Sequence, residues 1–418
     1  MTENDKMKLL KTVALTLIMT AFTAFASEFT FNATVDIPDN GGKTEIDETE
    51  NDGENKAFTL TDSSAMIGLE EISVSAKSAI LCTDDGLVLY EKQADIPLPM
   101  ASITKVMTAI VALEAIKDIS VSVEVSSKAV GTEGSSVYLK NGEKVTLEML
   151  LYSAMLESAN DATVALAIAV AGSEEGFVSL MNEKAASLGM KSTSFANPHG
   201  LPSSEHYTTC EDYARLMAYA LKNDAFREII STRKKIYPSS DGSLTRVLTN
   251  HNRLLTTYKD MIGGKTGFTK TSGRTLVTAA ERDGTTLICV TINASNDWND
   301  HTELFDEGFQ RVNTQKFSCQ RTIPLAGGKS ERIKCSFSED ISITSENGTD
   351  IEVIYTLPHM IFAPVSKGQR VGYAVFYQNG KEIFKKDIYA AYSVEAMETS
   401  AEKIGFFDKI TGFFKWKS

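Results

Sequence analysis

Three short motifs, far apart along the chain, place the strongest constraint on its fold. They are Ser102-Ile-Thr-Lys105, Ser158-Ala-Asn160 and Lys265-Thr266-Gly267. Together they supply the hydroxyl, amine and amide groups of an active-serine acyl-transfer site, so the fold must bring all three to one cleft. Order and context carry this prediction, because Ser400-Ala-Glu-Lys403 and Ser345-Glu-Asn347 match the first two patterns with no expected role.

The first motif predicts a nucleophile and its base. Residues 106–116 are dense in Ala, Val, Leu and Met without Pro or Gly, which predicts a buried helix with Ser102 at its start. Lys105 follows one helical turn later, so its amine can reach the Ser102 hydroxyl. Lys105 can accept that proton only when neutral, and burial or a second cation such as Lys265 would favour the neutral form.

The second and third motifs complete the predicted site. Ser158-Ala-Asn160 separates two apolar segments of helical spacing, which predicts a loop where Ser158 passes a proton to the leaving amine and Asn160 holds the substrate backbone. A helix cap made by Ser158 or Asn160 is the alternative. The glycines beside Lys265 favour an edge strand, with Lys265 and Thr266 facing a bound peptide. A phosphate loop fits poorly, because the earlier glycine of that pattern is missing.

Strand patterns at both ends of a helical middle predict the architecture. Runs at 79–82 and 87–90 flank a hairpin signal, helical patterns extend to about Leu221, and strands return at 264–292. This order predicts an α/β (α+β) catalytic domain with one antiparallel sheet flanked by helices. After about Arg311, short strand-like runs separated by turns such as Asn379-Gly380 predict a small all-β sandwich.

With these residues in place, the chain resembles the D-alanyl-D-alanine carboxypeptidase family of low-molecular-mass penicillin-binding proteins, the penicillin-binding protein 5-like serine peptidases. The similarity covers roughly residues 70–392, and includes the segments 188–201, 206–209, 212–216 and 363–369. The family's motif set is Ser-x-x-Lys, Ser-x-Asn and Lys-Thr-Gly, and here Ala159 occupies the middle of the second. The resemblance implies a β-lactamase/transpeptidase-like catalytic domain followed by a β-sandwich stalk.

The resemblance also implies an activity. The chain is expected to remove the terminal D-alanine from peptidoglycan pentapeptide stems through a Ser102 acyl-enzyme, and to be acylated by penicillins. It implies catalytic roles for Ser102, Lys105 and Ser158, an oxyanion hole from the backbone N–H groups of Ser102 and Phe268, and substrate binding by Asn160, Lys265, Thr266, Gly267 and Phe268. No cofactor or metal is expected.

Some family members have an arginine at a position where this chain has His251, and that arginine helps to bind the terminal carboxylate of the substrate. Arg253, Arg274, Thr266 and Lys265 are the other candidates for this contact, and the sequence does not choose among them. Two alternative functions remain, a DD-endopeptidase that cuts cross-links and a penicillin-binding sensor without turnover. A β-lactamase is disfavoured, because no Glu-x-x-Leu-Asn segment follows Asn160.

The ends of the chain predict export and attachment to a membrane. Residues 1–26 form a signal peptide pattern, with an uncleaved anchor as the alternative, and residues 27–65 form an acidic linker. Between them and the C terminus we expect a catalytic domain at 66–312 and a sandwich at 313–394. Residues 395–418 predict an amphipathic helix whose Phe and Ile face enters the outer surface of the cytoplasmic membrane, with lysines around it.

The net charge and the cysteine pattern argue against nucleic-acid-binding and zinc-binding proteins. The formal net charge of −13 argues against nucleic acid as a partner. Five cysteines form no Cys-x-x-Cys pair and five histidines form no His-Glu-x-x-His pattern, so the sequence has no zinc signature. Cys319 and Cys335, both in the predicted sandwich, are candidates for a disulfide.

Overall fold

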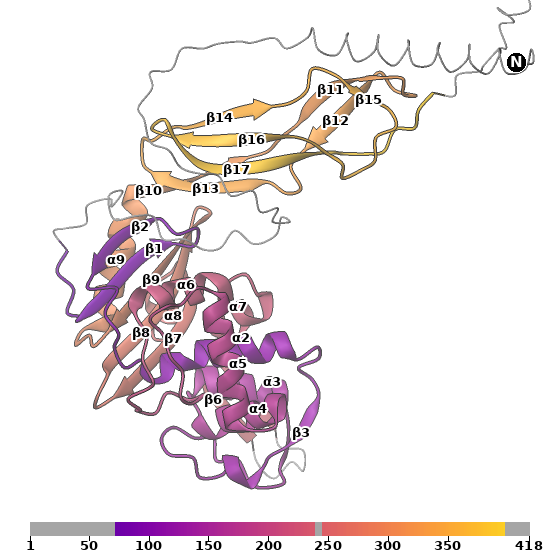
Figure 1. The fold of residues 1–418 in the computed structure, drawn as a ribbon. Helices are drawn as coiled ribbons and strands as arrows, with labels where there is room; N and C mark the ends of the chain where they lie inside the picture. Colours follow the sequence, from indigo (N-terminus) through magenta and orange to yellow (C-terminus); the bar gives the residue numbers. More distant parts are fainter. Residues whose placement is uncertain (1–71, 239–244, 398–418) are drawn as a thin grey trace, which may run out of the picture. The chain divides into compact units, whose positions relative to one another are not determined.

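The computed structural model describes residues 72–238 and 245–397. The predicted signal peptide, the acidic linker and most of the predicted C-terminal helix lie outside these residues. The predicted start of that helix at 395 is wrong, because residues 395–397 are extended and pair with residues 327–329. Figure 1 shows a mixed helix and sheet region, from indigo to salmon, and an all-β region from orange to yellow. The predicted fold class, an antiparallel sheet with helices followed by a β-sheet domain, is confirmed.

A five-stranded antiparallel sheet forms the centre of the first region. Its order is β2-β1-β9-β8-β7, so strands distant in the sequence are neighbours. The strands are β1 (Ser78–Thr83), β2 (Val88–Lys92), β7 (Met261–Thr269), β8 (Gly273–Arg282) and β9 (Thr285–Ile292). The predicted hairpin between β1 and β2 is confirmed, and β7, which carries Lys265, is an edge strand as predicted.

The two faces of this sheet bury alternate side chains against different helices. Along β9, Ile288 and Val290 join the larger apolar cluster with the helical middle of the chain, whereas Leu287 and Cys289 join a second cluster with α9 (Asp297–Arg311). This period-two alternation is what a strand buried on both faces requires. The helices of the larger cluster are α2 (Lys105–Ala115), α3 (Leu147–Leu156), α4 (Asn160–Ala171), α5 (Glu174–Ser187), α6 (Cys210–Ala220) and α7 (Asp224–Ser231).

Side-chain caps define the starts of several helices. Thr146, Ser173, Thr209 and Asn223 each accept a hydrogen bond from a backbone N–H in the first turn of α3, α5, α6 and α7. Shorter elements complete the region. They are the helical turns η2 (Ala101–Thr104) and η3 (Ser127–Ala129), the hairpins β3 (Ser122–Glu124) with β4 (Lys144–Thr146) and β5 (Lys234–Pro238) with β6 (Thr245–Thr249), and α8 (Leu254–Thr257).

The C-terminal region consists of two sheets around one apolar cluster. One sheet pairs β10 (Val312–Phe317) with β13 (Ile341–Glu346), and the other has the order β14-β16-β17-β12-β11-β15. Its strands are β11 (Arg321–Ala326), β12 (Arg332–Ser336), β14 (Ile351–Thr356), β15 (Ile361–Phe362), β16 (Arg370–Gln378) and β17 (Lys381–Ala390).

Two sequence predictions fall in this C-terminal region. Asn379 and Gly380 form the tight turn between β16 and β17 with φ of 51° and 76°, so the predicted hairpin is confirmed. Cys319 and Cys335 are both buried free thiols, so the disulfide considered for them is not formed. The thiol of Cys319 instead faces the Cys335 carbonyl oxygen at 3.9 Å.

Within the described ranges, no single helix has the length and apolar character needed to cross a membrane. Helices α4 and α5 meet that test only when taken together, and they are bent by 83° at the break between them.

Candidate active site

The turn that carries Ser102 is held in an unusual backbone conformation. Ala101, the residue before Ser102, has a φ of +50°, a left-handed conformation that costs free energy for a residue with a Cβ. The structure fixes this turn from two sides. Thr275 of β8 donates a hydrogen bond to the Met100 carbonyl at 3.1 Å, and Thr104 donates one to the Ala101 carbonyl at 2.6 Å. The two residues that directly precede Ser102 therefore both have an anchored carbonyl group.

The Lys105 amine is fully buried and surrounded by three oxygen atoms. Its Nζ lies 3.1 Å from Ser102 Oγ, 2.7 Å from Asn160 Oδ1 and 2.6 Å from the backbone oxygen of His199. Burial lowers the pKa of Lys105 well below its usual value, and the charge of Lys265 lowers it further. The predicted meeting of Ser102, Lys105 and Asn160 is thus present in the structure.

These three contacts suit both protonation states of the amine. A neutral amine has two N–H bonds and one lone pair. Asn160 Oδ1 and the His199 oxygen can accept the two N–H bonds, which leaves the lone pair directed at the Ser102 hydroxyl. After it takes the serine proton, the ammonium has three donors for the same three oxygens. Lys105 can therefore accept a proton from Ser102 without moving.

The second motif lies in a tight connection between α3 and α4. Ser158 has a φ of +59° and is 6% exposed, and Asn160 is the first residue of α4. The capping alternative is wrong, because Ala159 occupies the N-cap position and no side chain caps α4. The amide of Asn160 instead connects Lys105 to the Glu133 carbonyl. The predicted loop between two buried helices is confirmed.

The third motif lies on the edge strand β7. Lys265 pairs with Val277, which belongs to the larger apolar cluster, so the Lys265 side chain is on the same face of the sheet as the helices. Burial lowers the pKa of Lys265 to about 7. Gly267 lies directly against the turn that carries Ser102, because a Cβ added at Gly267 would be 2.8 Å from the Ser102 backbone nitrogen. Only glycine permits this approach of β7 to Ser102.

Not every predicted group touches the nucleophile. Among the described residues, neither Ser158 nor Lys265 forms a hydrogen bond with Ser102 or Lys105, and the Lys265 amine donates to the Thr266 carbonyl at 2.8 Å. Thr266 is half-buried, and Phe268 follows Gly267 with 67% of its surface exposed. Burial lowers the pKa of Lys105, and the nearby charge of Lys265 lowers it further without a direct contact.

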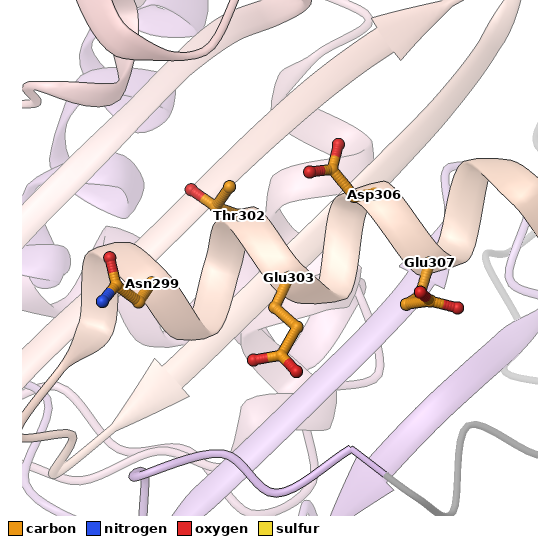
Figure 2. Close-up of a pocket in the computed structure, with 5 residues that line it drawn as sticks. All are labelled: Asn299, Thr302, Glu303, Asp306 and Glu307. Carbon is orange, nitrogen blue, oxygen red and sulfur yellow. The ribbon is translucent and has the colours of Figure 1, made fainter.

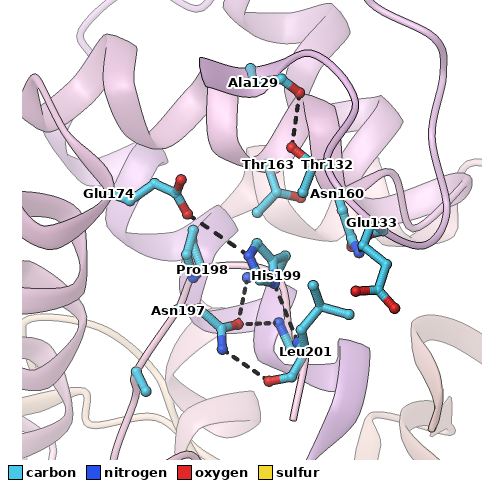
Figure 3. Close-up of polar contacts among 12 residues, drawn as sticks. Ala129, Thr132, Glu133, Asn160, Thr163, Glu174, Asn197, Pro198, His199 and Leu201 are labelled. Carbon is cyan, nitrogen blue, oxygen red and sulfur yellow. Dashed lines mark hydrogen bonds and ion pairs between the residues drawn. The ribbon is translucent and has the colours of Figure 1, made fainter. Parts of the chain in front are cut away.

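The segment 197–201 supplies contacts that the sequence did not reveal (Figure 3). Asn197 Oδ1 accepts hydrogen bonds from the N–H groups of His199 and Gly200, which folds the segment so that the His199 oxygen faces Lys105. Gly200 packs against the nucleophile turn, where a Cβ would lie 2.1 Å from the Ala101 oxygen. The His199 ring is near Glu174, at 3.8 Å, and burial lowers the pKa of His199 to about 3.

His206 and Thr104 form a second support that the sequence did not reveal. The Ala196 N–H donates to His206 Nδ1, so the neutral ring carries its proton on Nε2 and donates to Thr104 Oγ1 at 2.7 Å. Thr104 then donates to the Ala101 carbonyl. Burial lowers the pKa of His206 to about 4, which keeps this ring neutral near neutral pH. Each group in this chain of three hydrogen bonds donates to the next, and the last acceptor is the carbonyl of Ala101, the residue before Ser102.

Replacement of Thr104 with valine is expected to destabilise the fold by about 1–3 kcal/mol and to slow acylation of Ser102. The change keeps the side-chain shape but leaves the His206 Nε2–H and one acceptor position of Ala101 unsatisfied inside the protein. Urea unfolding midpoints measure the loss. Thr163→Val is the matched control, because Thr163 is equally buried and its hydroxyl bonds only to the Ala159 carbonyl of its own helix turn. Equal losses for the two variants would contradict the support assigned to Thr104.

Asp161 positions the loop that borders Asn160. Its carboxylate accepts hydrogen bonds from Ser136 Oγ at 2.7 Å, Val137 N at 3.1 Å and Leu139 N at 3.0 Å. The Asn160 N–H donates to the Ser135 carbonyl at 2.7 Å in the same segment. The loop at 133–139 is therefore attached to the start of α4.

His251 lies beside the segment that carries Ser158. Its Nε2 is 3.4 Å from Glu157 Oε2, and its N–H donates to the Leu156 carbonyl. Arg274 has a different position, since it pairs across the sheet with Phe268 and bonds Asp297 at the start of α9. Of His251 and Arg274, His251 is therefore the one that lies next to the second motif.

A pocket elsewhere on the molecule contains none of the motif residues. It has a volume of about 390 Å³ and is lined by Asn299, Thr302, Glu303, Asp306 and Glu307 of α9 (Figure 2). The described residues contain no group of three or more His, Cys, Asp and Glu side chains arranged to hold a metal ion.

Comparisons with known proteins match both regions of the chain. A family model described as D-alanyl-D-alanine carboxypeptidase matches residues 64–296, and one described as Penicillin-binding protein 5, C-terminal domain, matches residues 311–396. The chain is 32% identical to D-alanyl-D-alanine carboxypeptidase DacF of Bacillus subtilis (strain 168) over 335 residues, which cover 77% of this chain and 86% of the relative.

Two further relatives span most of the chain. D-alanyl-D-alanine carboxypeptidase DacC of Escherichia coli (strain K12) is 33% identical over 385 residues, covering 86% of this chain and 92% of the relative. Among solved structures, penicillin binding protein 5 from Haemophilus influenzae matches with a TM-score of 0.65 and 26% identity, over 78% of this chain and 100% of that one.

Proposed function

Because the chain belongs to the D-alanyl-D-alanine carboxypeptidase family, we propose that it removes the terminal D-alanine from peptidoglycan pentapeptide stems through an acyl-enzyme on Ser102. The resemblance inferred from the three motifs is confirmed, and the chain is a low-molecular-mass penicillin-binding protein of the serine-type hydrolases. The observation that carries the residue assignment is the buried Lys105 amine, 3.1 Å from Ser102 Oγ.

Acylation begins when Ser102 Oγ attacks the carbonyl carbon of the penultimate D-alanine. Lys105 Nζ accepts the hydroxyl proton as the new C–O bond forms, which its three contacts allow without movement. The negative charge on the former carbonyl oxygen is stabilised by the backbone N–H groups of Ser102 and Phe268. The close approach of Gly267 to the Ser102 nitrogen supports this assignment, since it brings the two N–H groups to one place.

The intermediate then collapses and the C–N bond to the terminal D-alanine breaks. Ser158 and Lys265 relay to the departing amine the proton that Lys105 took from Ser102, so Lys105 is neutral again when D-alanine leaves. Water next attacks the ester carbonyl and gives a proton to Lys105, and Ser102 recovers its hydroxyl proton as the ester bond breaks. Penicillins follow the acylation step only, because their strained amide imitates the same terminus and the product deacylates slowly.

The leaving group sets the direction of the substrate along β7. Its amine must lie near Ser158 and Lys265, and its carboxylate needs hydrogen-bond donors, which Lys265, Thr266 and His251 supply. The C-terminal end of the peptide therefore points toward Lys265, and the preceding residues run past Gly267 toward Phe268. The peptide is thus antiparallel to β7 and adds a strand to the open edge of the sheet.

Incubation of the protein with a pentapeptide stem and with a cross-linked muropeptide dimer tests this function. We expect mass spectrometry to show loss of one D-alanine from the pentapeptide, and no loss from a Ser102→Ala variant. Cleavage of the cross-link alone would favour a DD-endopeptidase. Penicillin labelling of Ser102 without turnover of either substrate would favour the sensor.

We also propose that the enzyme is exported and attached to a membrane. The substrate is outside the cytoplasm, so residues 1–26 act as the signal peptide and the enzyme works at the outer face of the cytoplasmic membrane. The catalytic domain at 66–312 and the sandwich at 313–394, followed by the extended residues 395–397, then lead to the amphipathic helix that we propose for the rest of the chain, in the membrane surface. Its apolar face and lysines, read from the sequence, support this part of the proposal.

Deletion of residues 403–418 is expected to move the enzyme from the membrane fraction to the soluble fraction. The deletion removes the apolar face and lysines that would bind the lipid surface, and leaves Ser102 and its contacts unchanged. Ultracentrifugation followed by labelling with fluorescent penicillin measures both properties at once. Membrane retention of a labelled, truncated enzyme would contradict the assignment.

A further inference from the structure

Two arginine side chains lie over a single tryptophan ring beside the substrate strand. The guanidinium carbons of Arg253 and Arg274 are 5.5 Å and 5.9 Å from the centre of the Trp298 ring. Arg274 is the cross-strand partner of Phe268, whose side chain is 67% exposed. We refer to Arg253, Phe268, Arg274 and Trp298 as the Trp298 patch.

The Trp298 patch carries more positive charge than its neighbours neutralise. Arg274 donates from Nε to Asp297 at 3.0 Å, and this carboxylate is only 4% exposed. Arg253 is exposed and adds a second guanidinium over the same ring, and exposed Lys270 lies two residues beyond Phe268. In a chain of net charge −13, two guanidinium groups over one half-buried aromatic ring, of which only that of Arg274 has a carboxylate partner among the described residues, favour an anionic ligand.

The position of the Trp298 patch along β7 indicates which residue of the substrate would contact it. Gly267 touches the Ser102 nitrogen, so the residue under attack lies beside Gly267. In a peptide that runs antiparallel to β7, the residue before the attacked one then lies opposite Phe268. Residues opposite each other in neighbouring strands direct their side chains to the same face of the sheet. Phe268 shares its face with Arg274, so the preceding side chain of the substrate points toward the Trp298 patch.

We propose that the Trp298 patch binds a carboxylate on the side chain of the third stem residue, the one that precedes the two D-alanines. The enzyme then prefers stems with meso-diaminopimelate, whose side chain ends in a carboxylate and an amine, over stems with L-lysine, whose side chain ends in an amine alone. This inference rests on the proposed function and on the direction of the substrate along β7. Arg253 is the main contact, because Arg274 already bonds Asp297.

The test compares two pentapeptides that differ only at the third residue, meso-diaminopimelate or L-lysine. For the full-length enzyme we expect kcat/KM to be about 10-fold higher with diaminopimelate. Arg253→Gln is expected to reduce that preference by about 3- to 10-fold, mainly through KM, because the contact is partly exposed to solvent. Arg253→Glu is expected to reverse it. Lys191→Gln removes an exposed cation outside the patch and should leave the preference unchanged.

Acylation by penicillin separates this subsite from the catalytic machinery. Penicillin has no third stem residue, so Arg253→Gln and Arg253→Glu should be acylated at the rate of the unaltered enzyme if both variants are folded. Equal kcat/KM for the two peptides, or an unchanged preference in both Arg253 variants, would overturn the subsite while the proposed function stands. Absence of turnover with both peptides would overturn the function and the subsite together.

Discussion

Replacement of Lys105 with methionine is expected to slow acylation of Ser102 by about 100- to 10,000-fold, the range typical of a lost general base. Methionine has nearly the length of lysine and suits a buried site, but it cannot accept the Ser102 proton. The loss should be in acylation itself, because Lys105 Nζ is the only amine within hydrogen-bond distance of Ser102 Oγ among the described residues. Stopped-flow mixing with a fluorescent penicillin measures the rate.

The pH dependence of the unaltered enzyme gives an independent check on this prediction. Lys105 is a base only when neutral, so acylation should become faster as pH rises through the pKa of Lys105. Burial and the charge of Lys265 both lower that pKa, so the rise should occur well below the pH at which lysine normally loses its proton. Lys105→Met should show no such rise. Lys191→Met, at an exposed position, should keep both the rate and the profile, and equal profiles for all three enzymes would contradict the assignment of Lys105.

Replacement of Lys265 with methionine is expected to abolish turnover and yet to stabilise the fold by about 1–3 kcal/mol at neutral pH. Burial lowers the pKa of Lys265 to about 7 from 10.5, so the folded protein holds this proton less tightly than the unfolded chain. Each unit of such a shift corresponds to about 1.4 kcal/mol, and the lost hydrogen bond to Thr266 offsets part of the gain. Burial of Lys265 therefore lowers the free energy of unfolding of the unaltered protein.

The sign of this effect sets its pH window. Between about pH 7 and 10.5 the unfolded chain binds more protons than the folded protein, so the free energy of unfolding should rise with pH across that window. Lys265→Met should make this rise smaller, while Lys105 still contributes to it. Urea unfolding at several pH values measures the slope, with Lys191→Met as the control. A Lys265→Met protein that is less stable than the unaltered one at neutral pH would contradict the account.

The elements that were predicted correctly depend on local patterns of residues. The helix after Ser102, the hairpins at Thr83 and Asn379, and the edge strand with Lys265 each follow from periodicity or turn residues within a few positions. The approach of Ser102, Lys105 and Asn160 was predictable because all three carry recognisable side-chain chemistry. A resemblance over most of the chain agreed with one antiparallel sheet flanked by helices, but the order of its strands became known only from the structure.

The supports of the site could not be predicted in the same way. Lys105 bonds the backbone oxygen of His199, and a backbone atom has no identity in the sequence. His206 reaches Thr104 across 102 positions, and nothing in either residue indicates that partner. The cap considered for Ser158 or Asn160 is wrong for a related reason, because the Asn160 amide is committed to Lys105 and the loop at 133–139. Only the fold reveals these long-range contacts.

Mapping the covalent product of penicillin tests the central claim most directly. The full-length enzyme is incubated with benzylpenicillin, digested with a protease, and analysed by tandem mass spectrometry beside a Ser102→Ala variant. The account predicts one penicilloyl adduct, on Ser102, and none in the variant. An adduct on another residue, or no adduct on an enzyme that is folded, would contradict the assignment of Ser102 as the nucleophile.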